Sequence, residues 1–245
     1  MPRGVVTKGL IKLRDFFAHF KGEPHQLAAI EQLQAAMPQS LLQADTAWVE
    51  TYRAAPRAKD PLIPQQNGAL VKASYYSQRD SQLPQQALRM CFSSSCAMLL
   101  SALKPGAISG PAADDQYLKR VLQHGDTVDA SAQLKALASY GVKARFVQNA
   151  TWTTLEHQLK QGIPVPCGFL HHGSVNNPSG GGHWLCVIGI TDKAIVAHDP
   201  FGEMDVVRGT YINTNGKEVI YSKANWGPRW MPDGPSTGWA ILAER

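Results

Sequence analysis

The segment at residues 89–103, RMCFSSSCAMLLSAL, constrains the fold of this chain more than any other stretch. From Cys96 onward its apolar residues recur three and four positions apart, which is the spacing of one face of a helix. Pro105 and Gly106 follow, and a proline cannot continue a helix while a glycine often ends one. The pattern predicts a helix that starts near Cys91 and is buried in the core of a domain.

Cys91 falls in the first turn of this predicted helix rather than in its middle. At a helix start the unpaired N–H groups and the helix dipole favour an anion, and therefore the nucleophilic thiolate over the thiol. This is the position of a nucleophile in a thiol enzyme. The alternative is that Cys91 is a small buried hydrophobe, as most free cysteines are. The segment alone leaves both interpretations open.

Composition indicates a folded protein with a sizeable core. Hydrophobic residues make up 44% of the 245 residues, and no run of about 18 apolar residues predicts a transmembrane helix. Residues 1–20 carry charges throughout and lack the apolar region and cleavage site of a signal peptide. Four cysteines in a chain of this length do not make a disulfide framework, and reduced thiols fit a cytoplasm. We therefore expect the protein to start in a cytoplasm.

The charge balance is basic, with a net charge of +5 and an isoelectric point near 9.0. Such a surface favours an anionic partner, which could be a nucleic acid, a membrane surface or an anionic cell wall. The lysines and arginines are scattered and form no run, so a generic basic surface is the competing interpretation. No nucleic-acid partner is expected.

The chain divides into three parts. Helical spacing of apolar residues, interrupted by turns, predicts a small helical domain at residues 1–53. Residues 54–70, AAPRAKDPLIPQQNGAL, are rich in Pro, Ala and Gln and show no period, which is typical of a linker. The main domain is predicted at residues 71–245.

Within the main domain helices come first and strands later, which favours an α+β fold with a mostly antiparallel sheet. Residues 71–76 suggest a short strand or an extended lead-in, and the tryptophan-rich tail after residue 221 is expected to wrap the sheet or line a cleft. Helices are predicted at residues 91–103, 114–124, 131–140 and 153–161, and strands at 142–147, 164–170, 183–190 and 194–198.

The last two predicted strands form a hairpin that brings a histidine and an aspartate together. His183 begins the first strand, Asp199 follows the second, and their midpoint is residue 191, in the turn at residues 191–193. Hairpin partners are symmetric about their turn, so the two residues should lie opposite each other, or nearly so. A carboxylate so placed can hold an imidazole, which supplies a base and its orienting group.

A thiol beside this pair would complete a hydrolytic site. The imidazole takes the thiol proton and later returns it to the leaving group. Glycines at 180–182 leave space beside His183, which Cys91 at its helix start could occupy. A tetrahedral oxyanion also needs donors, and the main-chain N–H of Cys91 and the side-chain amide of Gln78 are available.

Four short segments, in this order, resemble the papain-like cysteine peptidases of the bacteriocin-leader-peptidase type. They are residues 75–80 (YYSQRD), 91–100 (CFSSSCAMLL), 181–184 (GGHW) with 187–189 (VIG), and 198–200 (HDP). The resemblance implies that Cys91 is the nucleophile, His183 the base, Asp199 its orienting residue and Gln78 the oxyanion donor. It also implies a papain-like domain, without a cofactor. The chain departs from the family in a longer segment between Gln78 and Cys91, and in Phe92-Ser93 where Gly-Pro is usual.

The N-terminal part resembles a second arrangement. Short helical modules precede hydrolase domains in some phage lysis proteins, and residues 16–30 with Trp48 are similar to such modules. Together with the basic charge this favours a phage endolysin, held in the host cytoplasm until it reaches the wall, that cleaves the stem or cross-bridge peptides of peptidoglycan. The helical module would then contribute to wall binding. Two alternatives remain: a protein-processing peptidase, and an inactive wall-binding or virion module.

A metal site is the remaining rival. Cys167, His171 and His172 could bind zinc with His183 and Asp199, but zinc sites show tighter paired spacing, so no metal is expected. The other two cysteines, Cys96 on the apolar helix face and Cys186 within a strand, are interpreted as core residues.

Overall fold

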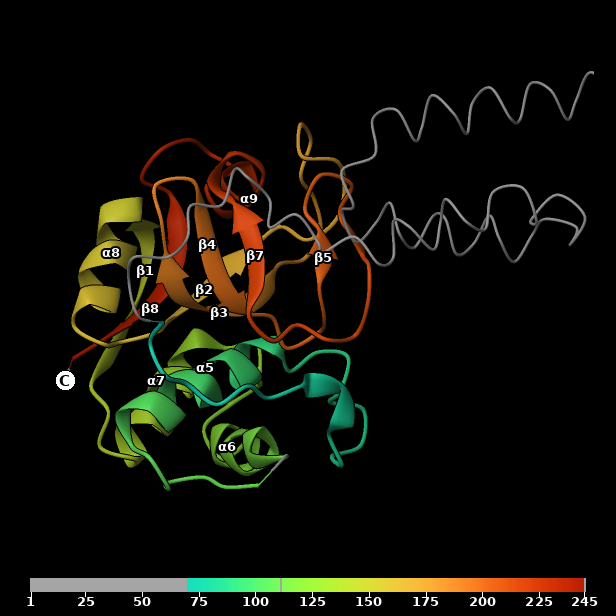
Figure 1. Cartoon of the computed structure of the whole chain (residues 1–245). Helices are drawn as coiled ribbons and strands as arrows, with labels where there is room; N and C mark the ends of the chain where they lie inside the picture. The colour runs from blue at the N-terminus through green and yellow to red at the C-terminus, as the bar shows by residue number, and fades with distance from the viewer. Residues whose placement is uncertain (1–69, 111, 245) are drawn as a thin grey trace, which may run out of the picture. The chain divides into compact units, whose positions relative to one another are not determined.

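A six-stranded sheet with the order β1-β8-β2-β3-β4-β7 forms the centre of the domain, and all its pairings are antiparallel (Figure 1). The computed structural model of the chain describes residues 70–110 and 112–244. The predicted helical domain at 1–53 and the predicted linker, apart from its last residue, lie outside the described residues. The strands are β1 (Ala144–Ala150), β2 (Val165–Phe169), β3 (His183–Ile190), β4 (Ala194–His198), β7 (Val219–Ser222) and β8 (Gly238–Ala243).

Helices cover both faces of this sheet (Figure 1). Trp184, Cys186 and Ile188 of β3 belong to one core with helices α5, α6 and α7. The alternate residues Leu185 and Val187 belong to a second core with α8 and α9. The helices are α5 (Cys91–Leu103), α6 (Ala113–Val121), α7 (Ala130–Ser139), α8 (Trp152–Lys160) and α9 (Lys223–Trp230).

This arrangement confirms the predicted α+β class, with helices packed on an antiparallel sheet. The bounds of α5, β3 and β4 agree with the predicted ones. Residues 71–76 form an extended lead-in rather than a strand, and the Val71 N–H donates to the Ile188 carbonyl at 2.8 Å. None of the helices in the described part of the chain is long and apolar enough to cross a membrane.

The C-terminal tail is more central than predicted. It supplies α9 and also β8, which pairs with both β1 and β2 and so lies inside the sheet. The sequence of β8, GWAILA, has no alternation because both faces of its second half are buried. A short ribbon of β5 (Met204–Asp205) and β6 (Thr210–Tyr211) also escaped prediction, since two-residue strands have no period to read.

Helix α5 carries three consecutive buried serines near its start. Ser93, Ser94 and Ser95 are all wholly buried, although each carries a polar hydroxyl group. The Ser93 hydroxyl lies 2.7 Å from that of Thr127 and accepts a hydrogen bond from the Gln133 amide at 2.8 Å. The Ser93 hydrogen bonds connect α5 to the loop before α7 and to α7 itself. The position of α5 against these elements is therefore fixed by hydrogen bonds as well as by packing.

Asp114 on α6 is the charged member of this layer. Its Oδ2 accepts the Ser94 hydroxyl at 2.6 Å, and its Oδ1 is buried with no hydrogen-bond partner among the described residues. Burial raises the pKa of Asp114 to about 7, helped by the neighbouring Asp80 and Asp115 and opposed by the Ser94 hydrogen bond. Above that pH the fold must bury an ionised carboxylate.

Asp114→Asn should therefore stabilise the protein at pH 8.5 more than at pH 5. The folded-state pKa lies above the unfolded value, so stability is lost as pH rises through about 7, by a few kcal/mol at most. Urea unfolding at the two pH values measures the difference. The neighbouring Asp115→Asn is the control: its two oxygens accept Ser81 and Gln82, so it should not stabilise at pH 8.5. The prediction is wrong if the gain from Asp114→Asn is the same at both pH values.

An aromatic stack joins the two layers. The rings of Phe92 on α5 and Trp184 on β3 lie parallel, with centroids 3.6 Å apart and planes 5° apart. Gly168 of β2 pairs with Trp184, and a Cβ at position 168 would lie 3.0 Å from the indole atoms Cε2 and Cζ2. The indole is confined between the sheet and Phe92, so it has little room to yield.

Gly168→Ala should destabilise the domain by about 1–3 kcal/mol because the new methyl group overpacks this site. Gly181→Ala is the matched control, since a Cβ there meets no atom within 4 Å, and it should change stability by less than about 0.5 kcal/mol. Equal urea midpoints for the two variants would show that the stack can shift freely.

Candidate active site

Cys91 is the first residue of α5 and the only cysteine of the four that is not buried. Met90 precedes it at the N-cap position and offers no side-chain hydrogen bond to the helix start. The main-chain N–H groups of the first turn are thus left to stabilise negative charge near the sulfur. Cys96, Cys167 and Cys186 are wholly buried, as predicted for Cys96 and Cys186. Cys91 is therefore the thiol that a substrate can reach.

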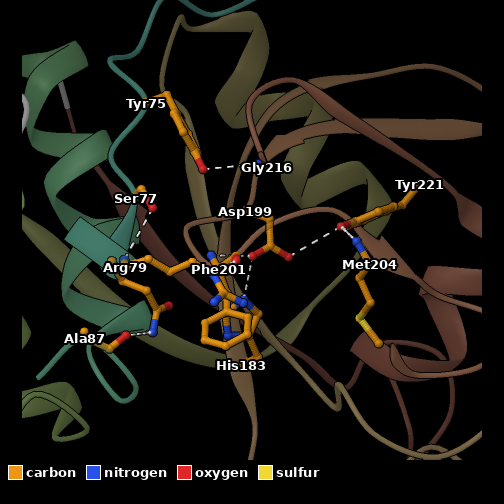
Figure 2. A network of polar contacts seen from close by, with 11 residues as sticks. Tyr75, Ser77, Arg79, Ala87, His183, Asp199, Phe201, Met204, Gly216 and Tyr221 are labelled. Atoms are coloured by element: carbon orange, nitrogen blue, oxygen red, sulfur yellow. Dashed lines mark hydrogen bonds and ion pairs between the residues drawn. The ribbon is translucent and has the colours of Figure 1, made fainter. Parts of the chain in front are cut away.

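His183 and Asp199 form a buried ion pair, seen at the centre of Figure 2. His183 Nε2 lies 2.7 Å from Asp199 Oδ1, and their side chains are 5% and 0% exposed. The same Oδ1 accepts the Phe201 N–H at 3.0 Å, and the Tyr221 hydroxyl lies 3.5 Å from Oδ2. The carboxylate is fixed from several sides and in turn fixes the imidazole.

The side chains of His183 and Asp199 are in contact, as predicted, but the predicted strand register is wrong by two residues. Cys186 pairs with His198, which puts Leu185 rather than His183 level with Asp199. The pairs Ile190–Ile195 and Gly189–Val196 centre the turn between residues 192 and 193 rather than on residue 191, and the irregularity between Val187 and Gly189 restores only one residue of this offset. His183 still shares a face with Leu185, so its side chain meets Asp199 diagonally.

The charge of His183 is set by these neighbours. Burial alone disfavours the imidazolium, but the charges of Asp199 and Cys91 and the hydrogen bonds to both outweigh it and raise the pKa of His183 to about 10. Because Nε2 is bonded to Asp199, Nδ1 is the nitrogen left for the sulfur. The imidazolium stabilises the fold fully below about pH 6.5, and this contribution is lost as pH rises through about 10.

Gln78 contacts the segments on either side of the His183–Asp199 pair and Cys91. It begins the short helix η1 (Gln78–Asp80) and is 1% exposed. Its main-chain N–H donates to the Pro200 carbonyl at 3.0 Å, next to Asp199, and its side-chain amide donates to the Ala87 carbonyl at 2.8 Å, four residues before Cys91. The amide group has a second hydrogen to donate. The structure thus brings Gln78 between the segments that carry the other predicted residues.

Aromatic rings enclose the imidazole, and sequence reasoning missed them. Phe169, Tyr211 and Phe201 meet the His183 ring roughly edge to face, at centroid distances of 5.4, 5.8 and 6.2 Å. They exclude water from the His183–Asp199 pair, which strengthens it. Tyr211 and Phe201 lie in the connections after β4, where no periodic pattern marked them.

A buried arginine supports the segments that carry this wall of aromatic rings around His183. Arg229 of α9 is wholly buried and donates to the carbonyls of Val206, Leu170, His172 and Gly173 at 2.6–3.1 Å. These carbonyls belong to the loop after β2 and to the segment after β5. Nothing in the sequence distinguished Arg229 from a surface arginine.

The alternative zinc site does not assemble. Cys167 is wholly buried and points into the core of α8 and α9. His171 and His172 lie together, with ring centroids 3.9 Å apart, and burial lowers the pKa of His171 to about 4, assisted by the nearby His183 and His172. Among the described residues no three His, Cys, Asp or Glu side chains are grouped so as to hold a metal ion.

The fold and this constellation define the class as a thiol-peptidase domain, and comparison with known families agrees. The model of the Peptidase_C39 like family matches residues 71–226. The chain belongs to this family of papain-like, bacteriocin-processing-type cysteine peptidases, as its sequence motifs predicted. No curated protein matches the sequence. The resemblance to phage lysis proteins has no counterpart in these comparisons and stays a prediction.

Solved structures also match the chain at low sequence identity. The peptidase domain of Streptococcus ComA, a bi-functional ABC transporter of a quorum-sensing pathway, is 18% identical, with 66% of this chain and 95% of that chain covered and a TM-score of 0.43. A double glycine motif protease from an AMS/PCAT transporter, in complex with the leader peptide, is 16% identical (72% and 94% covered, TM-score 0.44). A putative C39-like peptidase from Bacillus anthracis is 13% identical (73% and 98% covered, TM-score 0.48).

Asp199→Asn should lower the alkaline limit of cleavage activity. Without the carboxylate charge, burial is no longer outweighed and the pKa of His183 falls from about 10. We expect kcat/KM near neutral pH to fall by about 100-fold or more, since the amide also permits the wrong tautomer. The pH profile of kcat/KM from pH 4 to 11, on a peptide that the wild type cleaves, measures this limit, because loss of the His183 proton removes the general acid. Asp192→Asn in the β3–β4 turn is the control, and an unchanged alkaline limit in Asp199→Asn would contradict the assigned pair.

Proposed function

We propose that this chain is a cysteine peptidase in which Cys91 is the nucleophile and His183 the general base and acid. Asp199 orients the imidazole, and Gln78 with the main-chain N–H of Cys91 stabilises the oxyanion. The observation that carries the proposal is the coupling of His183 to both Asp199 and Cys91, which raises the pKa of His183 to about 10. At neutral pH such a site holds an imidazolium beside the sulfur, which is the resting state of a thiol peptidase.

The proposed reaction has two halves. The Cys91 thiolate attacks the carbonyl carbon, the oxyanion forms between the Gln78 amide and the helix start, and the proton on His183 Nδ1 passes to the leaving nitrogen as the C–N bond breaks. Water then attacks the thioester and gives a proton to Nδ1. The acid leaves and the thiolate is restored beside the imidazolium.

A polypeptide is the substrate that family membership supports best. The chain belongs to a C39-like family of cysteine peptidases, and a peptidase acts on the peptide bonds of polypeptides. We therefore propose limited cleavage of a protein or peptide precursor as the main reaction.

Peptidoglycan peptides are the second candidate, and the basic character of the chain favours them. A net charge of +5 would concentrate the protein on an anionic wall. In this case the enzyme would be made in the host cytoplasm, and residues 1–53 would contribute to wall binding. The same four residues would act on an amide bond of the stem or cross-bridge peptides.

Cys91→Ala should abolish cleavage, with kcat/KM reduced by at least about 1000-fold, because the nucleophile is absent. Purified protein is incubated separately with a proteome-derived peptide library and with cell-wall sacculi, and released fragments are identified by mass spectrometry. Cys96→Ala, which removes a buried thiol, is the control and should keep activity if the variant is folded. Fragments from the library alone support the processing peptidase, and fragments from sacculi alone support the wall enzyme.

Iodoacetamide labelling separates both enzymes from an inactive module. Preferential alkylation of Cys91 near neutral pH supports an activated thiolate, whereas slow, unselective labelling together with no fragments from either substrate would refute the proposed function.

A further inference from the structure

Arg79 is held in place at the edge of the proposed active site. It follows Gln78 in η1, and its guanidinium lies over the Phe201 ring, 3.7 Å from the centroid (Figure 2). Its Nε donates to the Phe201 carbonyl at 2.5 Å. An exposed arginine usually samples many rotamers, but the ring and the carbonyl fix this one from two directions.

The bonds that hold Arg79 leave its two terminal nitrogens unused. Nη1 and Nη2 make no hydrogen bond or salt bridge with any residue in the described ranges, and the residue is exposed. Arg89, only ten residues later, shows the contrast, because both its Nη atoms bind the carboxylate of Asp126 at 2.8 and 3.0 Å. The two terminal nitrogens of Arg79 thus form a fork that is held in position and has no partner in the described part of the chain. A guanidinium fork of this kind can bind a carboxylate through two hydrogen bonds.

The fork lies close to the reacting groups. Phe201, on which it rests, is two residues after Asp199, and the Phe201 ring is 6.2 Å from the His183 ring. The charge of Arg79 also reaches Tyr211, another ring of the wall around His183. Consecutive Cα atoms are about 3.8 Å apart, so the two residues from Asp199 to Phe201 span only a short distance. An extended substrate advances about 3.4 Å per residue, and a substrate residue a few positions from the scissile bond can therefore reach the Arg79 guanidinium.

We propose that Arg79 is a specificity-determining residue that binds a carboxylate-bearing residue of the peptide substrate within about three positions of the cleaved bond. The inference rests on the proposed peptidase function and adds the class of substrate, an acidic peptide. The guanidinium is already ordered, so binding the carboxylate costs little further side-chain entropy.

The test compares peptides that differ in one charge. The probe is a set of acetylated, amidated octapeptides built around the bond that the wild type cleaves best in the library, or around the sacculus peptide if only that is cleaved. Each has one Glu, its neutral counterpart Gln or a Lys, placed in turn at each of the three positions on either side of the bond. We expect Glu at one position to raise kcat/KM about tenfold over Gln in the wild type. The preference should vanish in Arg79→Met, decrease in Arg79→Lys, and reverse toward Lys-containing peptides in Arg79→Glu.

The ratio of the Glu to the Gln rate is the decisive readout. If Arg79 only fixed the position of Gln78 or Phe201, Arg79→Met would slow both peptides equally and leave the ratio unchanged, which would overturn the proposal. Arg120→Met on α6 is the control for a lost exposed positive charge and should keep the tenfold preference.

Binding separates this inference from the proposed function. The same peptides, labelled with a fluorophore, are titrated by anisotropy into the Cys91→Ala protein with and without Arg79→Met. A preference for Glu that depends on Arg79 supports the carboxylate site even if the wild type cleaves none of the peptides. Equal binding of the Glu and Gln peptides at every position refutes it, even if the wild type is an active peptidase.

Discussion

The parallel stack of Phe92 on Trp184 fixes the relation between the two halves of the proposed active site. Phe92 is the chain neighbour of Cys91, and Trp184 is the chain neighbour of His183. The sulfur is carried by a helix and the imidazole by a strand of the sheet beneath it, so a shift between these layers would separate the two groups. Close-packed aromatic faces resist such a shift. Phe92 stands where the family usually has glycine, and its ring makes this contact, which a glycine cannot make.

The buried cation is the second constraint, and it explains how much of the chain surrounds one imidazole. A desolvated imidazolium is stable only beside a fixed negative charge. Asp199 lies just past the end of β4, where its main-chain N–H donates to the Gly216 carbonyl at 2.8 Å and its side chain accepts the Phe201 N–H. The ribbon of β5 and β6 then brings Tyr211 over the ring. These contacts keep the Asp199 carboxylate beside the imidazole. The positive charge on His183 therefore depends on the folded arrangement of the chain around it.

Local patterns were sufficient to predict the elements that carry Cys91 and His183, but not the elements that support them. The apolar spacing after Cys91 and the uniform run of β3 are strong signals, and both elements have the predicted bounds. The hairpin argument found the partner of His183, although it centred the turn too early in the sequence, so its register is off by two residues. The insertion of β8 between β1 and β2 and the burial of Arg229 depend on contacts between residues far apart in sequence. Spacing within a window carries no information about such contacts.

Chemistry and selectivity are carried by different kinds of structure in this domain. The sulfur and the imidazole lie at the first residues of α5 and β3, elements that are largely buried, so their positions are fixed by packing in the core. The guanidinium of Arg79 and the ring of Phe201 come from short connections that are 122 residues apart in sequence and meet only at the edge of the site. Connections tolerate substitution better than core elements. A change of the charge at position 79 would therefore alter which peptides are accepted while the Cys91–His183–Asp199 geometry stayed the same.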